Sequence, residues 1–273
     1  MNIKLIAMDL DGTALQADHR SFSPRLTAAL DAAHRKGVRI APVTGRQFGL
    51  LPPAVLGHPV WEDLAVLCNG GQIRKLGTGE CLHRLDISAE ALHQLLILAA
   101  RYDLPIEFSV DSKLYLTEES LQKQLPYPNL TFHRDTILAN NGILVKSLEP
   151  MCAETVEKVN LLCINEELRA RVAEDLKKID VSAVWASSSS MEITHPDAAK
   201  GRGVARLCNL LGIPMEAVLA LGDSGNDETM LRQAGLGIAM GNAPDFVKAA
   251  ADAVTETNRN DGAALAIEQY VLK

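Results

Sequence analysis

Ile3-Lys-Leu-Ile-Ala-Met-Asp9-Leu-Asp11-Gly12-Thr13 is the stretch of the chain that best predicts its fold. The run from Ile3 to Met8 is nearly all apolar, which is typical of a strand covered on both faces in a parallel sheet. Such sheets usually place their chemistry at the carboxyl ends of the strands, where Asp9 and Asp11 stand here. Two neighbouring carboxylates repel each other unless a cation or a shared proton compensates. The stretch therefore predicts a cation-binding turn, with an acidic surface turn as the alternative.

Length and composition narrow the class of protein. The 273 residues, of which 47% are hydrophobic, suffice for one large or two modest domains. A formal net charge of −7 without a long basic run argues against a nucleic-acid partner. The N-terminal apolar stretch is too short for a signal peptide and no segment has the length of a membrane span, so we expect a cytoplasmic protein with no membrane partner. Five scattered cysteines predict reduced, mostly buried thiols, and the oligomeric state stays open.

A strand–helix–strand unit begins the fold. Ser23-Pro24 predicts the start of a helix that Gly37 closes, and Val38 to Val43 predicts a second strand. Because crossovers of this kind join parallel strands, the second strand ends at the same sheet edge as the aspartates. Its end, Thr44-Gly45-Arg46, offers a hydroxyl, a flexible backbone amide and a guanidinium, which suit an oxyanion such as phosphate. A capping threonine beside a surface arginine is the alternative.

The middle of the chain has a different pattern. A third strand over 64–67, with a polar turn over 68–71, still fits the first sheet, but from about Ile73 hairpins replace the alternation. Further predicted strands lie at 72–75, 81–85, 106–110, 113–117, 156–164 and 181–186, and predicted helices lie at 88–102 and after Asn165. This pattern indicates a smaller α+β module with an antiparallel sheet over 84–188. The serines 187–190 predict a hinge back to the first domain, with an exposed turn as the alternative.

The last third returns to strand–helix alternation, so we expect an α/β fold in which 1–83 and 189–273 form one core with a Rossmann-like parallel sheet. Lys200 opens a predicted helix, where a cation opposes the helix dipole, so it is expected to face an anion. The buried-type strand Ala217 to Leu221 runs into Gly222-Asp223-Ser224-Gly225-Asn226-Asp227, an oxygen-rich cluster that suits Mg2+. A turn of Asn and Asp without metal is the alternative.

Four motifs in this order resemble the haloacid dehalogenase-like (HAD) hydrolase superfamily. They are Asp9-Leu-Asp11-Gly12-Thr13, Thr44-Gly45-Arg46, Lys200 and Gly222-Asp223-Ser224-Gly225-Asn226-Asp227. The chain is similar in particular to the Cof-type phosphatases, which carry an α+β cap of the C2, type IIB kind between the second and third motifs. Gly241-Asn242-Ala243 also looks like that group. The one departure is Ala14, where the family often has a leucine that packs rather than reacts.

The resemblance implies a Mg2+-dependent phosphatase, a phosphoric monoester hydrolase that acts on small phosphorylated metabolites such as sugar or cofactor phosphates. In such an enzyme Asp9 is the nucleophile that forms an aspartyl-phosphate. Asp11 protonates the leaving alkoxide and then activates water. A phosphotransferase or mutase, and a non-catalytic phosphate-ligand sensor, are alternatives on the same fold. Carbon–halogen hydrolysis is disfavoured, because Asp11, Asp223 and Asp227 indicate a metal-assisted phosphoryl route.

The resemblance also implies which residues bind metal and phosphate. The metal ligands it implies are Asp9, the backbone carbonyl of Asp11 and Asp223, with support from Asp227. The implied phosphate-binding groups are Lys200, Thr44, Asn226 and the amides of Leu10 and Gly45. Arg46 lies next to this set without an assigned role. In the cap, Trp185, Tyr115 and Phe108 are candidates for an inner surface, with core packing as the alternative.

Overall fold

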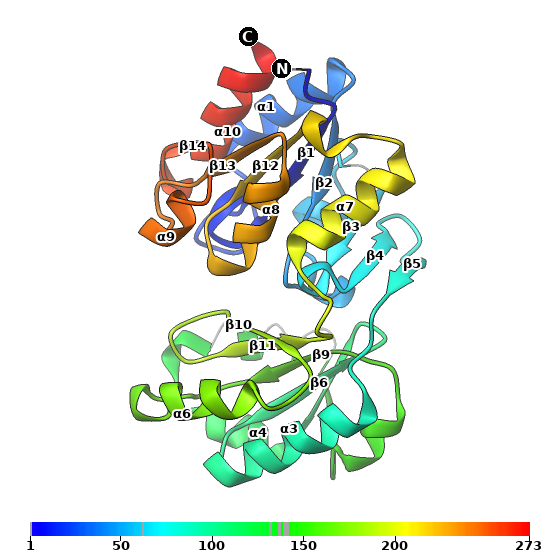
Figure 1. Cartoon of the computed structure of the whole chain (residues 1–273), viewed down its shortest axis with the longest axis vertical. Coiled ribbons are helices and arrows are strands. Elements are labelled where there is room, and N and C mark those ends of the chain that lie inside the picture. The colour runs from blue at the N-terminus through cyan, green and yellow to red at the C-terminus, as the bar shows by residue number, and fades with distance from the viewer. Residues whose placement is uncertain (1, 62, 131–132, 136–137, 139–141) are drawn as a thin grey trace. The chain divides into compact units, whose positions relative to one another are not determined.

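The computed structural model describes residues 2–61, 63–130, 133–135, 138 and 142–273. The chain divides into two compact units (Figure 1). The first comprises Met1–Arg46, Leu51–His83 and Ala199–Lys273, and the second comprises Gln47–Leu50 and Arg84–Ala198. No helix in the described part of the chain combines the length and apolarity needed to span a membrane. All five cysteines are free thiols and four of them are buried, as the sequence predicted.

The first unit is built on a five-stranded sheet in the order β14-β13-β12-β1-β2, in which every neighbouring pair is parallel. Its strands are β1 Leu5–Met8, β2 Arg39–Pro42, β12 Val218–Gly222, β13 Leu236–Ala239 and β14 Ala253–Val254. The four residues of β1 have no exposed surface. Burial on both faces explains the unbroken apolar run and confirms the predicted α/β fold class.

Helices complete the first unit. They are α1 Pro24–Arg35, α2 Pro53–Leu56, α7 Lys200–Leu211, α8 Glu228–Gln233, α9 Asp245–Lys248 and α10 Gly262–Ile267. Helix α1 begins where the sequence predicted it, because the Ser23 hydroxyl accepts the Leu26 N–H at 3.0 Å. Residues of α7 and α8 share one apolar cluster with Leu5 and Ala7 of β1, and α1 packs against α10. The helices thus pack around the parallel sheet, and loops follow the carboxyl ends of its strands (Figure 1).

The predicted third strand belongs to a different sheet. β3 (Leu64–Leu67) pairs antiparallel with β4 (Gln72–Lys75), and β5 (Cys81–Arg84) completes a three-stranded sheet. A single parallel bridge between Val43 and Val66, and a hydrogen bond from the Thr44 N–H to the Val66 carbonyl at 2.9 Å, join β3 to the end of β2. The carboxyl end of β3 therefore still lies beside that of β2.

The second unit contains a six-stranded sheet in the order β10-β11-β9-β6-β7-β8, antiparallel except between β7 and β8. Its strands are β6 Ile106–Val110, β7 Lys113–Thr117, β8 Gly142–Val145, β9 Val156–Leu161, β10 Ser182–Trp185 and β11 Met191–Thr194. Its helices include α3 Ala89–Tyr102, α4 Glu118–Gln124 and α6 Glu166–Leu176. Phe108, Val159 and Ile193 on one face of the sheet pack with Leu92 of α3 and Val172 of α6.

Two predictions for this unit are wrong. β11 lies between β10 and β9, so Met191–Thr194 belongs to the second unit, which ends at Ala198 rather than at the predicted 188. Serines 187–190 form the turn between β10 and β11, and the Ala186 N–H donates to the Ser190 carbonyl at 3.0 Å. The exposed-turn alternative therefore fits these serines, which lie inside the second unit rather than between the two units.

Candidate active site

The loop after β1 brings Asp9, Asp11 and Gly12 to the carboxyl edge of the parallel sheet. The Asp9 N–H donates to the Leu221 carbonyl of β12 at 3.0 Å, which extends the sheet pairing into the loop. Gly12 has a φ of +80°, and a Cβ placed on it would lie 2.4 Å from Oδ2 of Asp223. Glycine is required here both by the left-handed backbone and by the approach of that carboxylate. Thr13 Oγ1 donates to Oδ1 of Asp223 at 3.1 Å, so the first and fourth motifs meet.

Lys200 joins two carboxylates from distant parts of the chain. It is the first residue of α7 and is 1% exposed, and its Nζ lies 2.6 Å from Oδ1 of Asp9 and 2.6 Å from Oδ1 of Asp227. The second oxygen of Asp227 accepts the N–H groups of Asp223 at 3.0 Å and Ser224 at 2.9 Å. Burial would lower the pKa of Lys200, but Asp227 and Asp9 raise it above its ordinary value. Lys200 thus faces two carboxylates of its own chain, and its contact with a phosphate stays a prediction.

Three carboxylates crowd around this lysine. Asp9, Asp223 and Asp227 each offer an oxygen within 4.8 Å of the others. Burial raises the pKa of Asp9 well above its ordinary value, with Asp227 and Asp223 adding to the effect and Lys200 opposing it. Burial and the neighbouring Asp227 raise the pKa of Asp223 to about 6. A single ammonium group does not neutralise three acids, so the set has the oxygen donors and the excess negative charge that fit a hard divalent cation.

Asp11 has a different environment from Asp9. Its carboxylate accepts from Arg46 Nε at 2.8 Å and Nη2 at 2.7 Å, and His19 Nδ1 lies 2.8 Å from its Oδ1. Its side chain is 40% exposed, against 5% for Asp9. Burial would raise the pKa of Asp11, but the hydrogen bonds from His19 and Arg46 hold it well below its usual range. The hydrogen bond to Asp11 in turn raises the pKa of His19. Two carboxylates that are two residues apart in the chain and have opposite pKa shifts are suited to separate chemical roles.

The other predicted phosphate-binding residues lie on the segments that follow β1, β2 and β12. Thr44 is buried, and its hydroxyl accepts the Arg46 N–H at 3.2 Å. Asn226 Nδ2 donates to Oδ1 of Asn69 at 2.9 Å. Leu10 is buried and Gly45 is partly buried. Within the described residues neither Thr44 nor Asn226 hydrogen-bonds to Asp9 or Lys200.

Three contacting residues were not predicted as site residues. Asn242 Nδ2 donates to the Gly12 carbonyl at 2.9 Å and to Oδ2 of Asp223 at 3.2 Å. In the sequence, Gly241-Asn242-Ala243 indicated only a resemblance to the family. The feature that could have predicted a site role for Asn242 is a carboxamide side chain directly after a buried strand. Asn69 lies in the polar turn after β3, and the sequence predicted that this turn lies at the same edge of the sheet. His19 lies in a surface loop, where nothing in the sequence distinguished it.

Comparison with known proteins identifies the family. Residues 6–267 match a haloacid dehalogenase-like hydrolase family. The chain is 31% identical over 281 residues to the phosphoglycolate phosphatase of Methanobrevibacter smithii, with 100% of both chains covered. It is 29% identical over 275 residues to the Bacillus subtilis 5-amino-6-(5-phospho-D-ribitylamino)uracil phosphatase YcsE, covering 100% of this chain and 97% of YcsE. The solved structure of a HAD subclass IIB sugar phosphatase matches with a TM-score of 0.83 and 25% identity over 98% of each chain.

The chain belongs to the haloacid dehalogenase-like hydrolases. The predicted family is confirmed, and the match runs through the second unit as well as through the four motifs. The relatives named above are phosphatases, which supports the predicted enzyme class, a phosphoric monoester hydrolase.

Proposed function

We propose that the chain is a Mg2+-dependent phosphatase that hydrolyses small phosphorylated metabolites through an aspartyl-phosphate intermediate. The observation that carries the proposal is the buried contact of Lys200 with Asp9 and Asp227 beside the carboxylate of Asp223. The names of the relatives support phosphate esters of small molecules as substrates. The free cysteines are consistent with the cytoplasm, and nucleic-acid and membrane partners are not proposed.

The proposed metal ligands are the carboxylates of Asp9 and Asp223 and the backbone carbonyl of Asp11. The spacing of the carboxylate oxygens supports this choice. Asp227 has the supporting role, because its two oxygens already accept from Lys200 and from two backbone N–H groups. When bound, Mg2+ supplies positive charge against the oxygens of the phosphoryl group.

Asp9 is the proposed nucleophile. Its carboxylate oxygen forms a bond to phosphorus as the bond from phosphorus to the leaving oxygen breaks, and Asp11 gives that oxygen a proton. Asp11 then takes a proton from the water that attacks the aspartyl-phosphate, which releases phosphate and restores Asp9. Arg46 and His19 favour the ionised form of Asp11, the form that acts as a base. For Asp11 to donate a proton, its carboxyl group has to leave Arg46, and this gives Arg46 a proposed role in switching Asp11.

The remaining motif residues would bind the phosphoryl oxygens. These are Lys200, Thr44, Asn226 and the backbone amides of Leu10 and Gly45. A buried ammonium group with backbone and side-chain donors stabilises the charge on the outer oxygens of a transferring phosphoryl group. The second unit is the proposed cap, which selects the substrate and excludes water.

Hydrolysis of p-nitrophenyl phosphate with and without Mg2+ tests the proposal. We expect metal-dependent release of inorganic phosphate, and a loss of at least about a thousandfold in kcat for Asp9→Asn, because an amide cannot act as the nucleophile. Asp245→Asn is the control, since Asp245 is an exposed acid at the start of α9 in the same unit. Full activity of Asp9→Asn, or equal rates without metal, would contradict the mechanism. Transfer of the phosphoryl group to added glycerol without phosphate release would favour a phosphotransferase.

A further inference from the structure

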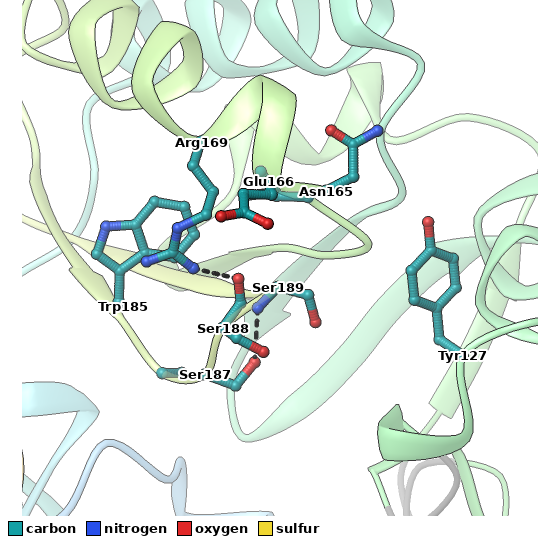
Figure 2. A pocket seen from close by; sticks show the side chains of 10 residues that line it. Tyr127, Asn165, Glu166, Arg169, Trp185, Ser187, Ser188 and Ser189 are labelled. Carbon is teal, nitrogen blue, oxygen red and sulfur yellow. Dashed lines mark hydrogen bonds between the residues drawn. The ribbon is translucent and has the colours of Figure 1, made fainter.

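The second unit contains a pocket of its own, with a volume of about 650 Å3 (Figure 2). This volume lies within the range of about 300–1,000 Å3 that is typical of small-molecule sites. The turn 187–189 after β10, the first turn of α6 and Tyr127 line it. Figure 2 shows Tyr127 across the pocket from Trp185. All of these residues belong to one unit, so the pocket is a property of that unit alone.

The serine turn is held in one shape by its own hydrogen bonds. The hydroxyls of Ser187 and Ser190 lie 2.6 Å apart, and Ser187 Oγ accepts the Ser189 N–H at 3.2 Å. The Ile164 N–H donates to the Ser189 carbonyl at 2.8 Å, which ties the turn to the residue just before α6. Because these hydrogen bonds already order the turn, it loses little conformational entropy when a ligand binds.

Arg169 and Trp185 form a second fixed wall. The guanidinium carbon of Arg169 lies 3.8 Å from the centroid of the Trp185 ring, and Nη1 of Arg169 donates to the Ser188 carbonyl. The stacking and the hydrogen bond hold the guanidinium flat against the indole. A ligand in the pocket would therefore meet a planar shelf rather than a mobile side chain.

Polar groups at the start of α6 have spare hydrogen-bonding capacity. Within the described residues the Glu166 carboxylate makes no hydrogen bond or ion pair. Asn165 uses Oδ1 to accept the Leu168 N–H at 3.0 Å, and its Nδ2 has no partner in that part of the chain. Across the pocket, the Tyr127 hydroxyl makes one long contact, at 3.4 Å, to the Cys163 carbonyl. The pocket thus offers acceptors and donors together, as a ligand with several hydroxyl groups requires.

The charges in the pocket limit the ligand further. Glu166 places a negative charge in the first turn of α6, where it already compensates the helix dipole and opposes an anion. Arg169, on the same helix, places a positive charge over the Trp185 ring and opposes a cation. We propose that this pocket binds a neutral, hydroxyl-rich group, namely a sugar or polyol. This group has two possible sources. It is the non-phosphate part of the substrate, which rests on the proposed function, or it is a free sugar or polyol, which is independent of that function.

Fluorescence of Trp185 in the full chain tests the binding directly. Trp61 is the other of the two tryptophans, and its buried Nε1 has no hydrogen-bond partner, so Trp61→Phe isolates Trp185 without removing a hydrogen bond. We expect ribitol or glucose to change this fluorescence saturably, and gluconate and glucosamine, their charged counterparts, to bind more weakly. Glu166→Gln should weaken binding about tenfold, because it removes a charge-assisted hydrogen bond. Tyr127→Phe should weaken it about threefold by removing the opposite hydroxyl.

Glu167→Gln is the matched control, because Glu167 is also exposed and shares the first turn of α6 but does not line the pocket. Its affinity for ribitol or glucose should equal that of the parent. No saturable change with either neutral ligand, tighter binding of a charged counterpart, or an equal effect of the two glutamate substitutions would overturn the proposal. Competition between the free ligand and a sugar phosphate would identify the substrate moiety as the source, and independent binding would identify a free ligand. The fluorescence change measures ligand binding even if the protein does not hydrolyse p-nitrophenyl phosphate. Failure of the proposed function is therefore distinguishable from failure of this proposal.

Discussion

Gly12 and Gly37 have the same φ of +80° but different surroundings. A Cβ on Gly12 would meet the Asp223 carboxylate, whereas a Cβ on Gly37 would meet nothing within 4 Å. We therefore expect Gly12→Ala and Gly37→Ala each to lose about 1 kcal/mol of unfolding free energy from the left-handed backbone. Only Gly12→Ala should also lose phosphatase activity, by at least about tenfold, because it displaces Asp223. Thermal unfolding and kcat/KM of both variants check this, and equal activities would contradict it.

At the residue scale, sequence reasoning identified the groups but not all of their contacts. The spacing Asp9-Leu-Asp11 indicated two like charges that need compensation, and the structure supplies Lys200 to one and Arg46 to the other. The opposite shifts in the pKa values of these two acids depend on burial and on His19. Burial arises only from the folded chain, so a linear motif cannot predict it.

Among the elements, β6 carries a buried carboxylate that should affect the stability of the second unit. Oε1 of Glu107 accepts from Gln124 at 2.8 Å, and Oε2 accepts from Asn160 at 3.1 Å and lies 2.9 Å from His133 Nε2. Burial would raise the pKa of Glu107, but these partners, His133 foremost, hold it below its ordinary value of 4.5. A carboxylate whose folded pKa is lowered stabilises the fold above pH 4.5 and loses that contribution as the pH falls through the folded pKa.

Glu107→Gln should therefore lower the unfolding free energy of the second unit at pH 7 by about 1–3 kcal/mol. Its stability should also fall less than that of the parent when the pH drops below 4.5. Denaturant titrations that follow Trp185 in the Trp61→Phe background measure both effects, because Trp185 packs against the core of this unit. Glu154→Gln, at an exposed position of the same unit, should match the parent. Parallel pH dependences of Glu107→Gln and the parent would contradict the assignment.

Element boundaries followed from the sequence where caps mark them. Ser23, Ser88 and Asn165 each accept a backbone N–H at the start of their helices, as predicted. Helix α4 and strands β8 and β14 were not predicted. α4 has only seven residues and β14 only two, so neither is long enough to show a period. Serines 187–190 left a hinge and an exposed turn as alternatives, because tight turns and flexible hinges share the same small polar residues.

For the whole molecule, the division at Ala198 predicts which fragment folds alone. A chain of residues 84–198 contains every strand of the six-stranded sheet and its apolar cluster, so we expect a cooperative unfolding transition. A chain of residues 84–188 lacks β11, which lies between β10 and β9, and should show no such transition. Circular dichroism during thermal unfolding compares the two fragments. Equal cooperativity would contradict the assignment of β11 to this unit.

The overall architecture was predictable because three of the four motifs follow parallel strands, β1, β2 and β12, and the α/β class follows from the alternation of strands and helices. The end of the second unit was not predictable in the same way. Met191–Thr194 reads equally well as a strand of either sheet, and only its pairing with β9 and β10 decides between them. Pairing between distant segments is not encoded in local pattern.

The placement of β1 between β2 and β12 has a consequence during translation. The ribosome delivers β1 first, yet its second neighbour emerges only after Gly222 has been synthesised. Until then one edge of the nascent strand stays unsatisfied, while residues 84–198 are already complete and able to fold. Vectorial synthesis therefore completes residues 84–198 before the unit that contains β1.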